Sequence, residues 1–127
     1  MAKKKAPAFQ FYVRDWLSEP EVRRLSLASR GIWIDILAYM WLEEEQGKLE
    51  AGIPELARMC GASESEIEAF LREAERVGLC SVSRFCPGDV PACPENVQLV
   101  SRRMHREWKD REMQDVWKRN REMRKAR

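Results

Sequence analysis

The chain has no long hydrophobic run. Among its 127 residues, no apolar stretch approaches the roughly 20 residues that a membrane span needs. The basic N-terminus, MAKKKAPAF, is not followed by the apolar segment of a secretory signal. These two absences predict a cytoplasmic protein without a membrane partner. Its 44% apolar and 35% charged residues are typical of a globular domain.

Residues for catalysis are scarce as well. The sequence holds one histidine, and it has no glycine-rich phosphate loop, no nucleophile elbow and no carboxylate pair in a recognisable context. The sequence therefore shows no recognisable group of side chains for acid–base or nucleophilic catalysis, and we expect a non-catalytic protein without a cofactor. The histidine, His105, lies in a basic polar segment and is expected on the surface.

The four cysteines lack the spacing of a structural zinc site. Five residues separate Cys80 from Cys86 and six separate Cys86 from Cys93, whereas zinc knuckles use two. We expect no metal, and a zinc clip completed by His105 stays the alternative. Without a secretory signal the thiols should be reduced, with Cys60 and Cys80 as small buried residues.

Charge, by contrast, is abundant and unevenly distributed. Residues 1–14 carry four basic groups and no acid, residues 15–100 carry 8 basic and 16 acidic groups, and residues 101–127 carry 11 basic against 5 acidic groups. The net charge of +2 thus hides an acidic middle between two basic ends. Such ends are typical of polyanion-binding arms and also of plain solubilising tails.

Large apolar side chains are concentrated in the stretch LSLASRGIWIDILAYMW, and we predict the main helix there. It should begin at Ser26 or Ser29 and extend to about Gln46. Between residues 32 and 42 its apolar side chains lie nearly all round, which is typical of a helix buried on most sides. A short helix is expected before it, over about residues 19–25.

Two further helices, joined by a tight turn, follow a short extended piece at residues 48–50. The segment IPELARMCG predicts the first of them, with Pro54 in its first turn. Ser63 and Glu66 have the spacing of a capping box at the start of the second, which Gly78 should end.

The next segments predict a β-hairpin. Residues 79–85 (LCSVSRF) and 97–101 (VQLVS) alternate as strands do, on either side of a Pro- and Gly-rich stretch. A helix-turn-helix followed by a two-stranded β-hairpin wing is the layout of a winged helix. We therefore predict an α+β, mainly α, winged helix-turn-helix domain over residues 11–101, after a basic disordered arm at residues 1–10.

Residues 102–127 predict an extended basic C-terminal helix or tail. Met113, Val116, Asn120 and Met123 recur at spacings of three, four and three, which gives the helix a thin apolar seam. The seam could support a homodimer, pack on the domain or fray.

Four strings within residues 11–107 carry a family resemblance: FYVRDWL, RRLSLASRGIWIDILAYMW, LARMCG and SRRMHRE. They resemble a family of phage and prophage replication proteins, described as replisome-organiser-like. The likeness is strongest at Asp15-Trp16 and Arg30-Gly31-x-Trp33. It implies an N-terminal winged-helix domain and a role in DNA replication, with DNA and replication proteins as partners.

The second helix of the helix-turn-helix is poorly suited to the major groove. Between Ser63 and Gly78 five glutamates face two arginines, a net charge of −3, and the first turn is the most acidic part. Phosphate contacts supply most of the affinity of such proteins. The acidic helix therefore argues against a winged-helix transcriptional regulator and favours core packing, or an adaptor whose acidic face docks a basic partner.

Contacts to DNA are expected from the basic segments instead. Flexible basic arms and wings hold the phosphate backbone without reading sequence, so we predict salt-dependent, non-specific binding to single- or double-stranded DNA. Trp108 and Trp117 either stack on bases or anchor the last helix. The expected contact residues are Lys3, Lys4, Lys5, Arg84, Arg102, Arg103, Arg106, Lys109 and Arg111.

Asp35 stands out as an acid inside the apolar main helix. It shares a helical line with Ala28, Gly31 and Ala38, along which a neighbouring segment could approach closely. A carboxylate buried there would need a partner, so we predict a structural buried pair rather than a catalytic acid. The expected partners are Arg102 or Arg103, with Arg30 as the local alternative.

Overall fold

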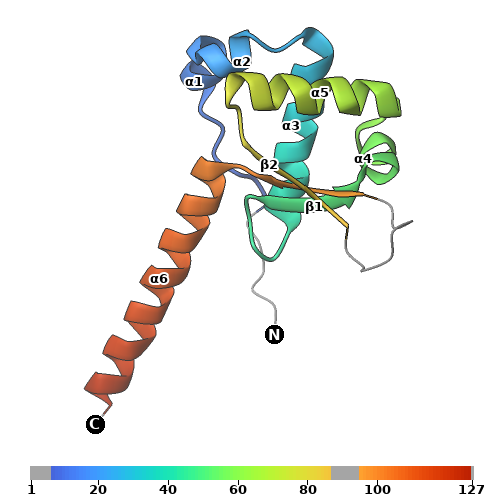
Figure 1. Ribbon diagram of the computed structural model, residues 1–127. Helices are drawn as coiled ribbons and strands as arrows, with labels where there is room; N and C mark the ends of the chain where they lie inside the picture. The colour runs from blue at the N-terminus through green and yellow to red at the C-terminus, as the bar shows by residue number, and fades with distance from the viewer. Residues whose placement is uncertain (1–6, 87–94, 127) are drawn as a thin grey trace.

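The computed structural model describes residues 7–86 and 95–126 and has an α+β architecture that is mainly helical (Figure 1). This confirms the predicted class at that level. In Figure 1 the helix α6 projects from the body formed by the other elements. The order is α1 (Val13–Ser18), α2 (Pro20–Arg23), α3 (Leu27–Leu42), β1 (Lys48–Gly52), α4 (Ile53–Cys60), α5 (Glu64–Val77), β2 (Ser81–Phe85), β3 (Asn96–Val100) and α6 (Arg102–Lys125).

The two strands of the predicted hairpin, β2 and β3, pair antiparallel as expected, but the sheet has a third strand and the order β1-β3-β2. The added strand is β1, which pairs with β3 from Lys48 opposite Val100 to Gly52 opposite Asn96. The sequence pattern indicated an extended piece there. Its pairing could not be foreseen, because the partner strand lies about fifty residues further along the chain.

The core lies between α3, α5 and one face of this sheet. Ile36 and Met40 of α3 and Phe70 of α5 are completely buried, as is Leu99 of the central strand. The rings of Trp33 and Phe70 stack with their centroids 6.2 Å apart. The main helix thus supplies the core as expected, but it is not buried on most sides: its buried residues follow one face, and the line through Gly31 and Asp35 is exposed.

The limits of α3 follow from its capping contacts. The Oγ of Ser26 accepts a hydrogen bond from the Ser29 amide at 3.2 Å, which selects Ser26 as the first of the two predicted starts. The helix ends at Leu42, four residues before the predicted end. The chain turns back there. The side-chain Nε2 of Gln46 donates a hydrogen bond to the Trp41 carbonyl at 3.0 Å, so a side chain satisfies a carbonyl at the helix terminus.

A cluster of one carboxylate and two hydroxyl groups joins α5 to the start of α3. The carboxylate of Glu73 accepts hydrogen bonds from the Ser26 amide at 2.8 Å, from the Ser26 hydroxyl at 3.1 Å and from the Ser29 hydroxyl. Desolvation alone would raise the pKa of Glu73, but the hydrogen bonds from both serines outweigh it and lower the pKa. Glu73 is thus a distant acidic cap for α3.

Replacing Glu73 by glutamine should destabilise the fold by about 1–2 kcal/mol at neutral pH, because charge-assisted hydrogen bonds are lost. The folded carboxyl has a lowered pKa, so its contribution exists above the unfolded value of 4.5 and disappears as pH falls through the folded pKa. Urea denaturation of both proteins at neutral and acidic pH measures this difference. Glu75→Gln, an exposed change on the same helix, is the matched control. A gap between wild type and Glu73→Gln that persists at low pH would contradict the assignment.

Asp35 is exposed, so the predicted buried pair is wrong. The small residues on its helical line, Ala28, Gly31 and Ala38, are exposed too, and a Cβ added at Gly31 would meet no described residue within 4 Å. Small side chains on that line mark the solvent face of α3 rather than a close approach. Neither predicted arginine reaches it.

Because Gly31 lies inside α3 with open space around it, Gly31→Ala should stabilise the protein by about 0.5–1 kcal/mol. Alanine restricts the unfolded chain and favours the helix. An increase in the thermal midpoint without a change in the circular dichroism spectrum would agree with this. A decrease would mean that another segment does approach this face.

Within the described ranges no helix combines the length and the apolar character that crossing a membrane requires.

Candidate functional site

The candidate site is a cleft of about 460 Å³ between the N-terminal segment and the start of α6. Chain segments from distant parts of the sequence form its walls: residues 9–22, the inner side of α3, the two residues after α5 and the first turns of α6. Six aromatic residues line it, and four arginines of α6 lie beside them. They are Phe9, Phe11, Tyr12, Trp16, Trp33 and Trp41, with Arg102, Arg103, Arg106 and Arg111.

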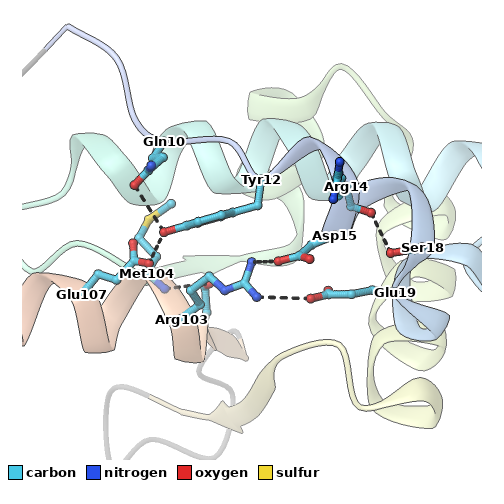
Figure 2. Close-up of polar contacts among 10 residues, drawn as sticks. Gln10, Tyr12, Arg14, Asp15, Ser18, Glu19, Arg103, Met104 and Glu107 are labelled. Carbon is cyan, nitrogen blue, oxygen red and sulfur yellow. Dashed lines mark hydrogen bonds and ion pairs between the residues drawn. The ribbon is translucent and has the colours of Figure 1, made fainter.

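Arg103 connects the two walls of the cleft (Figure 2). Its guanidinium lies 2.8 Å from a carboxylate oxygen of Asp15 in α1 and 3.4 Å from one of Glu19. The same group lies over the ring of Tyr12, with 4.4 Å from its central carbon to the ring centroid. Two acids and one aromatic face therefore hold this cation, and it is engaged within the protein.

Tyr12 makes a second link to α6. Its hydroxyl donates a hydrogen bond of 2.5 Å to the carboxylate of Glu107, as Figure 2 shows. This hydrogen bond is the main reason why the pKa of Tyr12 is raised above its usual value. The Tyr12, Arg103 and Glu107 contacts fix the angle at which α6 leaves the domain.

The opposite side of α6 packs on the turn before β1. The Ser101 amide donates to the Gly47 carbonyl at 2.8 Å, and His105 bonds to Glu45 at 2.7 Å. Hydrogen bonds from His105 and Lys48 lower the pKa of Glu45. His105 has a side chain only 12% exposed, so its predicted surface position is wrong. Because Gly47 has no side chain, the backbone of α6 at His105 can approach this turn closely.

Arg111 completes the attachment one turn further along. Its guanidinium donates to the Gln46 side chain at 2.5 Å and lies 5.4 Å from the ring centroid of Trp41. Trp108 stacks on His105 of the same helix, with centroids 5.5 Å apart, and this contact decides neither of the two roles predicted for it. Beyond Arg111 the residues of α6 are almost all exposed.

The nine predicted contact residues are thus not equivalent. Lys3, Lys4 and Lys5 lie outside the described residues. Arg84 on β2 lies 3.2 Å from Glu68 and 4.0 Å from Glu95, so two acids neutralise it.

Of the six on the wing and α6, four arginines make contacts within the protein, and two cations have none among the described residues. Arg102 is exposed but donates to the Gly78 carbonyl at 2.7 Å. Arg106 and Lys109 are exposed, and the structure shows no ion pair or hydrogen bond for either among residues 7–86 and 95–126. Positive charge that is free of a protein partner therefore does not run continuously from Arg84 on the wing to Arg106 on α6.

The predicted acidic helix is α5, and its first turn is occupied by its own cap. The Ser63 hydroxyl accepts from the Glu66 amide at 3.1 Å, while the Glu66 carboxylate accepts from the Ser63 amide at 2.9 Å. This confirms the predicted capping box. It also leaves a carboxylate where a recognition helix would meet the bases.

The chain has no significant match to any family model, curated protein or solved structure.

In the described part of the chain no three His, Cys, Asp or Glu side chains are placed to hold a metal ion. The alternative zinc clip needed Cys93, which lies outside that part. Cys80 is buried as predicted, and burial raises the pKa of its thiol to about 12.

Sequence reasoning missed the residues that attach α6, namely Tyr12, Asp15, Glu19, Glu45 and Glu107. One signal was available. The FYVRDWL and SRRMHRE strings of the family resemblance contribute Asp15 and Arg103, which form the ion pair between α1 and α6. Their separation of almost ninety residues hid the contact.

Proposed function

We propose that the chain is a non-catalytic DNA-binding or replication-assembly module of phage type, which holds the nucleic-acid backbone mainly through α6. The element order α3-β1-α4-α5-β2-β3, with a sheet in the order β1-β3-β2, supports a winged-helix assignment for the body. The role in replication rests on the family resemblance.

The observation that carries the DNA-binding part is the outward face of α6. Arg102, Arg106 and Lys109 follow each other at spacings of four and three, on the side turned away from the buried Met104. Further cations continue along the projecting half of the helix, all of them exposed. They are Lys118, Arg119, Arg121, Arg124 and Lys125.

Such an arrangement favours the phosphate backbone over base sequence. A rigid helix with spaced cations neutralises phosphates and releases their counterions, and this term does not depend on sequence. Within the described residues, α5 is acidic and Arg84 on β2 is paired with acids, so neither the second helix of the helix-turn-helix nor the wing offers a comparable row of cations. We therefore place the contact on α6, not on the helix-turn-helix or the wing.

Fluorescence anisotropy with labelled DNA tests the proposal. We expect two duplexes of unrelated sequence to bind with affinities within about threefold of each other at about 50 mM salt, and to dissociate as salt rises. Absence of binding to any DNA at that salt would refute the function. A strong preference for one duplex would refute the backbone mode and favour a regulator.

A second candidate, a protein-interaction adaptor, is favoured by an apolar stripe on the projecting half of α6. Met113, Trp117 and Met123 are 58%, 67% and 66% exposed, and Val116 lies between them. Exposed apolar side chains gathered on one helix face are typical of interaction sites, although Asn120 interrupts this stripe before Met123. The stripe suits a partner helix, including a second copy of this chain. Sedimentation equilibrium tests whether the partner is a second copy of this chain. A dimer formed by the stripe should become monomeric in the Met113→Ser, Met123→Ser double variant.

A further inference from the structure

The cleft beside α6 combines aromatic faces with an uneven distribution of engaged charges. Phe11 is 40% exposed and stacks on Trp16 with centroids 5.4 Å apart. Phe9 and Trp41 form a second pair at 5.8 Å. An aromatic ring that is exposed inside a cleft offers a stacking surface to a planar ligand.

The acids of the cleft are nearly all occupied. Asp15 and Glu19 hold Arg103, and Glu107 accepts the Tyr12 hydroxyl. Among the described residues, Glu21 is the one acid of the lining that has no ion pair or hydrogen bond.

The cations of the cleft are less fully occupied. Arg111 is held by Gln46 and Trp41. Arg106 is exposed and unengaged within the described ranges, and exposed Arg102 has one bond, to a backbone carbonyl. The charge available to a ligand at this edge is therefore positive, next to aromatic walls.

We propose that this cleft receives an unpaired base of a single-stranded nucleic acid, which stacks on Phe11 while Arg102 and Arg106 hold the flanking phosphates. The proposal rests on the proposed function and specifies that the nucleic acid bound beside α6 is single-stranded. Stacking on aromatic side chains beside a cationic track is how single strands are bound without sequence preference. A paired base cannot enter, because its faces are covered by its neighbours in the duplex.

The size of the cleft agrees with this ligand. A volume of about 460 Å³ lies within the range of small-molecule sites. The arginines at the edge argue against a purely apolar peptide, for which they would be a desolvation cost. The cleft and the outward cations of α6 share Arg102 and Arg106, so one strand can engage both.

Phe11→Ala tests the stacking role, with Phe85→Ala as the matched control. Phe85 on β2 is 36% exposed, similar to Phe11, but does not line the cleft. We measure the affinity for an oligothymidylate of about a dozen nucleotides, and for the same strand with abasic sites, by anisotropy. Loss of one stacked base should weaken wild-type binding about tenfold.

Four results are expected together. Wild type and Phe85→Ala prefer the oligothymidylate over the abasic strand about tenfold, Phe11→Ala shows no preference, and Phe11→Trp restores it. Thermal melting confirms that Phe11→Ala is folded. If that variant does not fold, Phe11→Trp and the abasic strand on wild type still decide the question.

The failures of the two proposals are distinguishable. Equal binding of the abasic and normal strands by wild type overturns the cleft assignment and leaves backbone binding intact. Binding of neither strand, and of no duplex, refutes the function itself. Thymidine monophosphate that binds as tightly as the strand would assign the cleft to a free nucleotide and overturn the strand proposal.

Discussion

Gly47→Ala is expected to cost about 3 kcal/mol or more in the free energy of unfolding. A Cβ at this position would lie 2.4 Å from the backbone nitrogen of His105 and 2.6 Å from its Cα. Neither atom can rotate away, because both belong to the first turns of α6. The φ of +94° adds strain for any residue with a side chain.

Gly61→Ala is the matched control for this variant. Its φ of +63° is also in the left-handed region, but an added Cβ meets nothing within 4 Å. We expect it to cost only about 1–2 kcal/mol, the strain alone. Urea denaturation of both variants measures the difference, which reports the packing of α6 on the turn before β1. Equal costs would mean that α6 does not dock there.

The Arg106→Gln, Lys109→Gln double variant is expected to weaken DNA binding about 60-fold at about 0.1 M salt. Each phosphate contact contributes a slope of about 0.9 in log affinity against log salt, or about eightfold per contact at that concentration. Both side chains are exposed, so stability should change by no more than about 0.5 kcal/mol. Anisotropy and thermal melting check the two statements.

The control is Arg72→Gln, Arg76→Gln, which removes the same charge from exposed positions of α5. It should leave affinity within about twofold, since only the overall field changes. If the α5 variant loses as much affinity as the α6 variant, DNA lies against α5 and the placement on α6 is wrong.

Local features of the fold could be predicted from the sequence. The Ser63 and Glu66 capping box and the Ser26 cap depend on residues three apart, and both occur as the spacing indicated. Gly61 and Gly78 end α4 and α5 in the left-handed conformation, as their positions after apolar periodic segments indicated.

Contacts between distant segments could not be predicted in the same way. Asp35 drew attention because it interrupts an apolar helix, yet the acid that meets Arg103 is Asp15. A helical line of small residues is compatible with close packing and with exposure, and only the neighbouring elements decide between them. For α3, no element among residues 7–86 and 95–126 covers that line at Gly31.

The cleft illustrates the same limit. Its aromatic residues come from a segment partly assigned to a disordered arm, and its arginines follow the last strand. Each set was visible in the sequence. The two sets meet because α6 docks on the turn just before β1. The position of that turn depends on the pairing of β1 with β3, which is remote in the sequence.

The most direct test of the central claim, that α6 binds the nucleic-acid backbone, is the salt dependence of duplex binding by the intact chain. We predict that log affinity falls linearly with log salt with a slope of about −3, as expected for three or four phosphates on one helix face. The slope should be the same for unrelated sequences. A slope near zero, or no measurable binding at low salt, would contradict the account.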